Sequence, residues 1–273
     1  MRVEHVLGKW VTYIHDLDCS KVLTNQEEKK LYDLLADRAV ICIKNQSLKH
    51  DDLIRVASIF GKVWDYKEDY GSRAFGVGHK QPEVEEEHSD NVEYVTEKGV
   101  LGNSYVPFHI DLNHYPIQYV PNRLLYCEAN DTKEPCPTVF LNTIVGFSRL
   151  DEGIQKLLRK STINLKAPYV GGRHATMKRP AVDWHPHHHK EYINIDGFTI
   201  DMDDYNGDFL SLRRTIYSQM EVDNERYEHH YEVGDLLIYD NRGTTHYRPE
   251  FEGHRMLKRV SWHHDWSKYV DYS

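Results

Sequence analysis

The chain has 273 residues, with 34 Lys and Arg against 43 Asp and Glu, and its formal net charge is -9. This acidic balance provides no basic field for a phosphate backbone, so DNA and RNA are not expected as partners. No stretch approaches the roughly 20 apolar residues that span a bilayer, and no apolar signal core follows residues 1–5. We therefore expect a cytoplasmic protein without a membrane partner, and the sequence leaves open whether it forms a homo-oligomer.

The length and the cysteines are both typical of one intracellular domain. All-β sandwiches and barrels reach this size with a single core, and no repeat or Pro/Gly/Ser linker divides the chain, so we expect one domain over residues 1–273. The four cysteines, Cys19, Cys42, Cys127 and Cys136, form no C-x-x-C pair. The sequence therefore predicts reduced, buried thiols, with neither a disulfide framework nor a thiolate zinc site.

The N-terminal part, residues 1–65, is predicted to form a helix, a strand and a second helix. Thr24 and Glu27 have the spacing of a capping box, which opens a helix that continues through Leu35. Residues 39–43 form an apolar, β-branched run that predicts a buried strand. The second helix is predicted from Asp51 to Gly61, because glycine tolerates a left-handed helix end.

Residues 75–100 precede the main group of predicted strands and contain an acidic run at positions 83–90. We predict that this segment is a lid over an active site, and that its acidic run is a solvated loop. The alternative is that Glu85, Glu86, Glu87 and Asp90 attract a cationic group of the substrate.

Short β-like runs dominate from residue 100 onward. They occupy residues 123–127, 138–141, 192–195, 198–200, 235–239 and 256–260, and the Asp196-Gly197 pair predicts a hairpin turn between two of them. Helical patterns at residues 148–158 and 209–220 predict a helical insert over about residues 145–220. The predicted fold is mainly β with flanking helices, a double-stranded β-helix (jelly roll, cupin-like) whose core covers residues 100–262.

Two histidines and one aspartate are the candidate metal ligands. His109 and Asp111 are two residues apart, and on an extended strand such a pair projects from the same face. His246 follows a strong apolar strand and a polar turn more than a hundred residues later. Two imidazoles and one carboxylate leave three coordination positions open on one face of a metal, an arrangement typical of iron(II) oxygenases.

Two arginines follow the second histidine in a strand-like segment. Arg255 lies nine residues beyond His246 and Arg259 lies four further on. A guanidinium near the metal can bind the far end of a dicarboxylate through two charge-assisted hydrogen bonds.

These residues together resemble the taurine dioxygenase and clavaminate synthase-like (TauD/TfdA) family of iron(II)- and 2-oxoglutarate-dependent dioxygenases. The resemblance covers roughly residues 100–262 and rests on His109-Ile110-Asp111, on the strand at 137–142 followed by a helix, on Tyr239-Asp240-Asn241-Arg242 before His246, and on Arg255 with Arg259. The sequence departs from the family at residues 134–137, where relatives carry glycines and an acidic residue.

The resemblance implies a role for each of these positions. His109, Asp111 and His246 would bind iron(II), Arg255 and Thr138 would hold the distal carboxylate of 2-oxoglutarate, and Arg259 would face an anionic group of the substrate. O2 would be the second cosubstrate, with succinate and CO2 as products. Because halogenating relatives replace the carboxylate ligand with a small residue, Asp111 favours hydroxylation, or a related desaturation or cyclisation, of a small polar substrate.

Several residues near these motifs have an equally simple structural explanation. Tyr105 and Leu112 are candidates for the substrate pocket, although core packing explains them as well. The histidine run at residues 184–189 is expected on the surface rather than at a metal, because adjacent histidines on a Pro-containing stretch do not converge on one ion. His114 is expected near the site or at the surface, and Asn241 in the turn that delivers His246.

Two other functions use some of the same residues. A jelly-roll binding or sensor protein without catalytic activity would keep the fold, yet it would not need Arg255 together with the complete set of ligands. A zinc-dependent hydrolase uses two histidines and a carboxylate, but its mechanism gives no reason for an arginine behind the metal.

Overall fold

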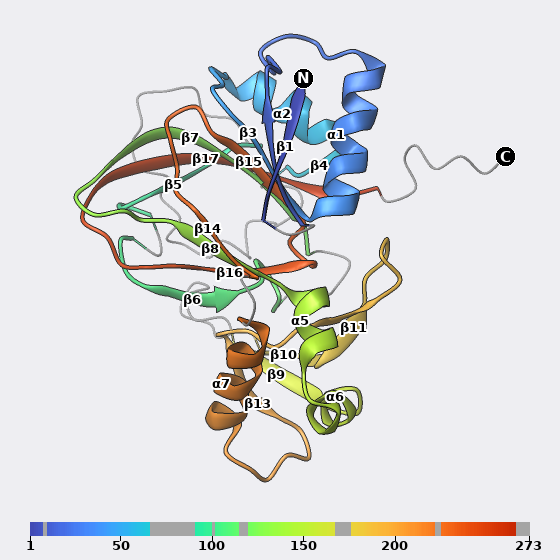
Figure 1. Ribbon diagram of the computed structural model, residues 1–273. Coiled ribbons are helices and arrows are strands. Elements are labelled where there is room, and N and C mark those ends of the chain that lie inside the picture. The colour runs from blue at the N-terminus through green and yellow to red at the C-terminus, as the bar shows by residue number, and fades with distance from the viewer. Residues whose placement is uncertain are drawn as a thin grey trace, which may run out of the picture.

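Two mostly antiparallel sheets stacked face to face form the body of the protein (Figure 1). The structure is a computed structural model that describes residues 1–7, 10–65, 91–99, 102–114, 120–166, 176–221 and 225–265. The acidic run at residues 83–90 lies outside the described residues. Of the predicted lid, residues 91–99 are described, and they include a strand of the larger sheet.

The larger sheet has eight strands in the order β1-β2-β3-β15-β7-β17-β4, with β5 also paired to β17. All its pairs are antiparallel except β2 with β3. Its strands are β1 (Arg2–Leu7), β2 (Val11–His15), β3 (Val40–Ile43), β4 (Gly61–Val63), β5 (Glu93–Thr96), β7 (Asn122–Thr132), β15 (Leu236–Tyr239) and β17 (Gly253–His264).

The smaller sheet has four strands in the order β14-β8-β16-β6. They are β6 (Val106–His109), β8 (Thr138–Asn142), β14 (Arg226–His229) and β16 (Thr244–Arg248). The two stacked sheets confirm the predicted double-stranded β-helix, in which sequence-distant strands meet at the centre of each sheet.

Two helices cover the outer face of the larger sheet. The predicted capping box is confirmed at the start of α1 (Asn25–Arg38), where the Thr24 side chain accepts from the Glu27 amide and Glu27 bonds back. The second helix, α2 (His50–Ser58), ends three residues before Gly61, so the prediction that Gly61 ends it is wrong. Gly61 instead opens β4, where a Cβ would overlap the His263 carbonyl of the paired strand.

Alternation along the strands builds two separate cores. Leu236 and Ile238 of β15 pack outward in a cluster with side chains of α1 and α2. Leu237 points the other way and packs between the sheets with Phe140 and Tyr227. This period-2 pattern is expected for a strand that is buried on both faces.

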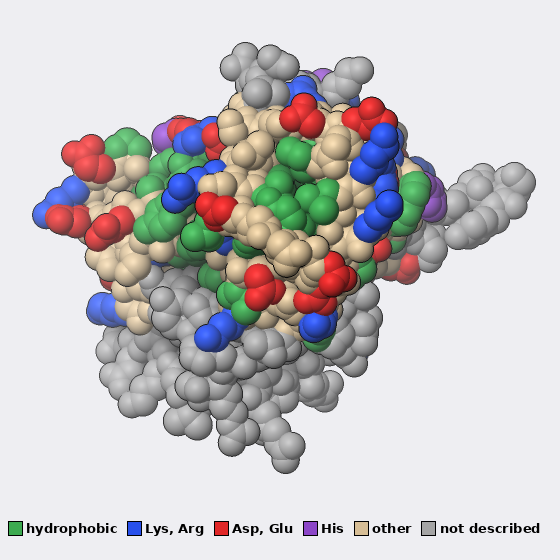
Figure 2. All heavy atoms as spheres, turned by 90° about the horizontal axis from the view of Figure 1, so that it is seen from below, with side chains coloured by type: hydrophobic (Ala, Val, Ile, Leu, Met, Phe, Trp, Pro, Cys, Tyr) green, Lys and Arg blue, Asp and Glu red, His purple; other side chains and the backbone are tan. Residues whose placement is uncertain are grey.

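A third unit is inserted between β8 and β14 and lies below the sheets in Figure 1. The predicted helical insert is instead mixed, with a three-stranded and a two-stranded sheet beside its helices. Its elements are α5 (Thr143–Arg149), α6 (Glu152–Leu158), β9 (Thr162–Lys166), β10 (Thr176–Pro180), β11 (Val182–Trp184), β12 (Glu191–Ile193), β13 (Thr199–Met202) and α7 (Phe209–Met220). Figure 2 views this end of the molecule and shows hydrophobic side chains ringed by charged ones.

The predicted hairpin at Asp196-Gly197 does not form, because β12 pairs with β11 and β13 pairs with β9. The Asp196 carboxylate is buried and binds the Phe198 amide and the Asn113 side chain. The Gly197 amide donates to the Phe108 carbonyl at 2.5 Å, and a Cβ at Gly197 would collide with the Pro107 ring. This turn therefore docks the inserted unit onto strand β6.

The burial predicted for the four cysteines is confirmed. All four cysteines are buried and free. None of the helices within the described ranges has the length and apolar character needed to cross a membrane.

Candidate active site

Strands β6 and β16 bring the two candidate histidines together. His109 and His246 are directly paired across the two strands, and their ring centroids are 4.3 Å apart. The prediction that Asp111 shares an extended strand with His109 is wrong, because β6 ends at His109 and Asp111 lies in the following turn. The turn still returns the carboxylate to the histidine, with Asp111 Oδ1 3.4 Å from His109 Nε2. The ligand atoms of all three side chains lie within 4.8 Å of one another.

The His109 ring is held in one tautomer. Its Nδ1 is 2.8 Å from the Pro107 carbonyl, and because a carbonyl only accepts, Nδ1 donates and leaves the lone pair on Nε2. Burial lowers the pKa of His109, but the Asp111 carboxylate outweighs it and raises the pKa above its usual value. The Nε2 atom is thus aimed at the Asp111 side chain, where a cation gains both ligands.

Three side chains from the larger sheet position the Asp111 carboxylate. Arg123 Nε and Tyr239 Oη donate to Oδ2 at 3.1 and 3.2 Å, and Arg259 Nη1 lies 3.8 Å from the same oxygen. Burial by itself raises the pKa of Asp111, but the Arg123 guanidinium and His109 hold it well below its usual range. The carboxylate therefore stays ionised, with Oδ1 turned toward His109.

Asn241 fixes the backbone of the turn that carries Asp111. Its side-chain oxygen accepts from the Asp111 amide at 3.0 Å, and its side-chain nitrogen donates to the Asp111 and Pro121 carbonyls at 2.9 Å each. Asn241 was predicted to organise the turn before His246, and its side chain joins that turn to the metal-ligand turn instead. Both candidate ligand segments are therefore held by one fully buried residue.

His246 is electrically neutral in this environment. Burial and the neighbouring His109 lower its pKa to about 3, and its Nδ1 is buried without a hydrogen-bond partner in the described part of the chain. Phe140 and Tyr239 rings pack 5.5 and 5.2 Å from it. Two imidazole nitrogens and one carboxylate oxygen at these separations fit a divalent metal ion of the iron(II) type.

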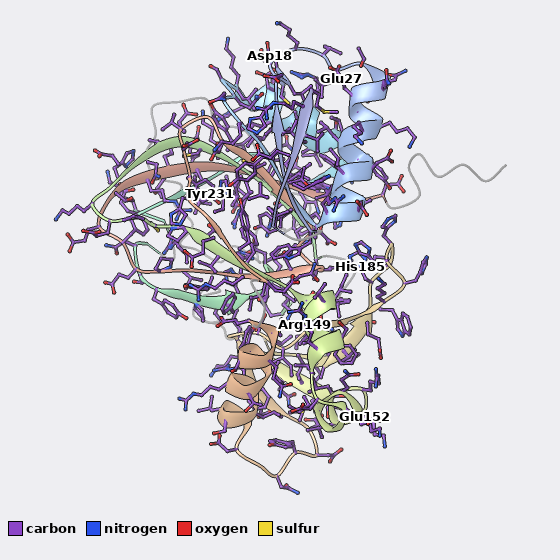
Figure 3. All side chains as sticks on the ribbon, viewed as in Figure 1. Asp18, Glu27, Arg149, Glu152, His185 and Tyr231 are labelled. Carbon is purple, nitrogen blue, oxygen red and sulfur yellow. The ribbon has the colours of Figure 1, made fainter. Side chains whose placement is uncertain are left out.

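Arg255 lies in a second group of buried side chains between the sheets. Its side chain is 3% exposed, and its Nη1 and Nη2 approach Cys136 Sγ at 3.3 Å and Thr138 Oγ1 at 3.4 Å. Its guanidinium stacks 4.7 Å from the ring of Tyr231, which Figure 3 labels in the space between the sheets. None of the described carboxylates pairs with this guanidinium. A buried, unpaired cation of this kind favours an anionic ligand.

The three predicted substrate residues have different surroundings. Arg259 Nε is 2.7 Å from Glu93 Oε2, so its charge is matched by a carboxylate of the paired strand β5. Tyr105 is 58% exposed, and its ring lies 6.0 Å from the ring of Tyr247. Leu112 follows Asp111 in the turn and has a φ of 59°. Contact of these three residues with a substrate stays a prediction.

Sequence reasoning missed Arg123, Tyr239 and Glu93. Arg123 and Tyr239 are direct cross-strand partners in β7 and β15, and neither was given a role at the metal ligands. A charged residue at the first position of the run at 123–127 was the available signal, because a buried guanidinium requires an acceptor.

The histidine run at residues 184–189 is not uniformly exposed, so that prediction is wrong for His185. This residue is fully buried, and its Nε2 lies 2.7 Å from Asp240 Oδ2. Its Nδ1 accepts from the amides of His187 and His188, so the Nε2 proton is directed at Asp240. Figure 3 shows His185 beside the connection between the sheets and the inserted unit, where it closes the turn after β15.

The comparisons with known proteins point to one family. Residues 3–261 match the family model for "Taurine catabolism dioxygenase TauD, TfdA family". The chain belongs to this family. Comparison with curated protein sequences gave no match. The iron(II)- and 2-oxoglutarate-dependent dioxygenase predicted from the sequence is therefore confirmed, with both cofactors.

Solved structures share the fold of this TauD/TfdA dioxygenase. A complex of AAD-2 with Mn(II) and N-oxalylglycine is similar with a TM-score of 0.80 at 17% identity, over 97% of this chain and 98% of that one. A taurine dioxygenase from Burkholderia xenovorans is similar with a TM-score of 0.75 at 15% identity, over 97% and 89% of the two chains. In the AAD-2 complex the metal and the oxalyl compound stand in for iron(II) and 2-oxoglutarate.

Proposed function

We propose that this dioxygenase hydroxylates, desaturates or cyclises a small polar substrate, an amino acid or amine-bearing acid, and that it releases succinate and CO2. In this proposal His109, Asp111 and His246 hold iron(II), and Arg255 with Thr138 holds the distal carboxylate of 2-oxoglutarate. The observation that carries the proposal is the buried Arg255 guanidinium, which has no carboxylate partner in the described chain and lies between the same two sheets as the three ligands.

The iron with its cosubstrate supplies the oxidising power, and the residues of this chain supply position and charge. Arg123 and Tyr239 fix Asp111 Oδ2, which leaves Oδ1 for the metal. The Pro107 carbonyl accepts a hydrogen bond from Nδ1 of His109, which keeps the ring proton on Nδ1. In the neutral imidazole Nε2 would therefore bind the iron through its lone pair. Phe140 and Tyr239 pack around His246 and exclude water from that side.

The pair formed by Glu93 and Arg259 supports the proposed substrate class. Their 2.7 Å contact lies beside the metal-ligand carboxylate, since Arg259 also approaches Asp111 at 3.8 Å. A zwitterion matches such a pair, with its ammonium on Glu93 and its carboxylate on Arg259. Both side chains are partly accessible, at 12% and 23% exposure, so exchange of the internal partner for a ligand is feasible.

Substrate-stimulated succinate formation tests this proposal. Iron-loaded protein with 2-oxoglutarate and O2 is assayed with amino acids, with their N-acetyl derivatives and with the corresponding decarboxylated amines. We expect the parent amino acids to stimulate succinate release and both truncated sets to fail. Equal stimulation by the N-acetyl derivatives would contradict the role of Glu93, and equal stimulation by the amines would contradict that of Arg259.

The two alternative functions are less consistent with the observations. Neither a binding or sensor protein nor a zinc hydrolase gives a role to the buried Arg255 guanidinium. Membership of the dioxygenase family also favours oxidation over both.

A further inference from the structure

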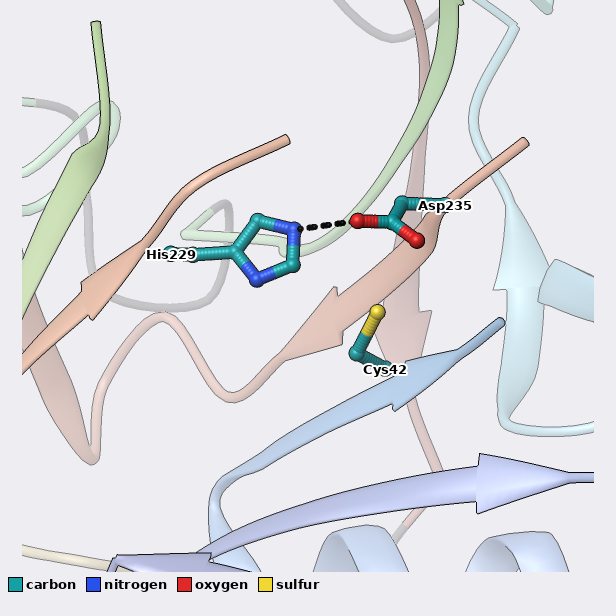
Figure 4. Close-up of side chains that lie close together, drawn as sticks. All are labelled: Cys42, His229 and Asp235. Atoms are coloured by element: carbon teal, nitrogen blue, oxygen red, sulfur yellow. Dashed lines mark ion pairs between the residues drawn. The ribbon is translucent and has the colours of Figure 1, made fainter. Parts of the chain in front are cut away.

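A second group of potential metal ligands lies away from the active-site triad. Cys42 is on β3 of the larger sheet, His229 ends β14 of the smaller sheet, and Asp235 immediately precedes β15 (Figure 4). Their ligand atoms lie within 4.8 Å of one another, and each residue is at most 1% exposed. The group thus connects the two sheets at a fully buried point.

The hydrogen bonds of His229 determine its tautomer. The Tyr227 hydroxyl donates its single proton to the Tyr13 hydroxyl at 3.1 Å. His229 Nδ1, 2.8 Å from the same Tyr227 oxygen, must therefore be the donor in that contact. In the neutral imidazole the lone pair is then on Nε2, which faces Asp235 Oδ2 at 3.3 Å. Two acceptors at this separation repel each other unless a proton or a metal cation lies between them.

The charges around Asp235 also favour a cation. Lys44 Nζ lies 2.7 Å from Asp235 Oδ1 and 2.7 Å from a carboxylate oxygen of Glu232. One ammonium therefore serves two carboxylates, and Asp235 Oδ2, which accepts from the Glu232 amide at 3.0 Å, also faces His229 Nε2 at 3.3 Å. A buried carboxylate that shares this ammonium with a second carboxylate gains from a further cation.

The separations match those around a small tetrahedral ion. Zinc bonds of about 2.0–2.2 Å to nitrogen and oxygen place the two ligand atoms roughly 3.4 Å apart in a tetrahedron. The observed distance between His229 Nε2 and Asp235 Oδ2 is 3.3 Å. A proton on Nε2 would also satisfy these two atoms, and the Cys42 sulfur would then serve only as a buried core thiol.

We propose that Cys42, His229 and Asp235 bind a thiophilic divalent cation, with zinc(II) the best match, in a buried site that joins the two sheets. On binding, the Cys42 thiol releases its proton to solvent and the resulting thiolate takes its place on the ion. The ion also supports the surroundings of Arg255. The His229 ring packs edge-on against the Tyr231 ring at 4.5 Å, and the Arg255 guanidinium lies over that Tyr231 ring.

Cobalt(II) titration of the full-length protein tests the proposal. Bound cobalt(II) gives an intense near-ultraviolet charge-transfer band only when a thiolate is a ligand. We expect about two equivalents in the wild-type protein, and about one in Asp111→Ala, which keeps the thiolate band. In Cys42→Ser the thiolate band is lost, and in Cys19→Ser, a buried cysteine of the outer core, it is retained.

X-ray absorption at the zinc edge keeps the test independent of the folding of any variant. With the Asp111→Ala protein loaded with one equivalent of zinc(II), we expect a sulfur scatterer at about 2.3 Å. A thiolate band that survives in Cys42→Ser, or a zinc environment without sulfur, would overturn the proposal and leave a proton between His229 and Asp235. Binding of only one equivalent by the wild-type protein, with the thiolate band present, would instead count against the iron site.

Discussion

Replacing Arg255 by methionine separates the effect of its buried charge on stability from its effect on 2-oxoglutarate binding. In the protein without cosubstrate, the guanidinium is 3% exposed and contacts only a thiol, a hydroxyl and two aromatic rings among the described residues. Burying an ion costs several kcal/mol, whereas a cation over an aromatic ring returns about 1–2 kcal/mol. Because methionine fills similar space and packs well on rings, Arg255→Met is expected to stabilise the cosubstrate-free protein by on the order of 1 kcal/mol.

The same substitution removes the proposed contact with 2-oxoglutarate. A bidentate charge-assisted contact contributes about 1.5–3 kcal/mol, which corresponds to roughly a 10- to 150-fold increase in Kd. In calorimetry, Arg255→Met should therefore unfold about 2–4 °C above the wild type without cosubstrate and lose most of the stabilisation that 2-oxoglutarate adds. The Kd is measured by anaerobic titration of the iron-loaded proteins.

Arg248→Met is the matched control. This arginine is also buried, but it donates to the Gly102 and Ser104 carbonyls at 2.8 and 2.7 Å. Its loss leaves two carbonyls unsatisfied, so stability should fall by about 1–3 kcal/mol while the 2-oxoglutarate Kd is unchanged. A destabilised Arg255→Met protein with wild-type affinity for 2-oxoglutarate would refute the reasoning.

Three further predictions concern residues that stabilise the site or the fold. Asn241→Leu removes three hydrogen bonds around the Asp111 turn, and iron(II) affinity should fall by on the order of 1–3 kcal/mol in an anaerobic titration; unchanged affinity would contradict the clamp. Burial lowers the pKa of His264 to about 3, so its stabilising contribution is complete above its unfolded pKa near 6.5 and is lost as pH falls. The free energy of unfolding of His264→Asn should therefore change less between pH 7.5 and 5 than that of the wild type, by about 2 kcal/mol. An equal change in both proteins would count against burial as the cause. Gly61→Ala should lower Tm by forcing a Cβ against strand β17, whereas Gly153→Ala in α6, with open space at its Cβ, should leave Tm equal or higher.

The sequence was most informative where a local pattern determines the structure. The Thr24 and Glu27 capping box, the α7 helix and the apolar run of β15 depend on neighbouring residues, and each was predicted correctly. The end of α2 was misplaced because Gly61 is required by a contact with β17, more than two hundred residues away. The Asp196-Gly197 turn was likewise misassigned because its partners are on β6 and Asn113, not on a neighbouring strand.

The candidate site shows the same division. His109, Asp111, His246 and Arg255 could be chosen from spacing and residue type, because metal ligands and a buried guanidinium leave recognisable patterns in sequence. The roles of Arg123 and Asn241 could not, since each depends on the register between strands that only the folded chain sets. His185 escaped prediction for the same reason, because its burial depends on contacts with Asp240 and Tyr192 that a surface-like Pro and His run does not indicate.

Anaerobic titration with iron(II) and then 2-oxoglutarate tests the central claim most directly. The wild-type protein should develop the weak visible charge-transfer band of a 2-oxoglutarate chelate on iron(II), and Asp111→Ala, with an intact fold by circular dichroism, should not. Such a band in the wild type alone would support His109, Asp111 and His246 as the ligands. A folded wild-type protein without the band, or a band of equal intensity in Asp111→Ala, would contradict the assignment.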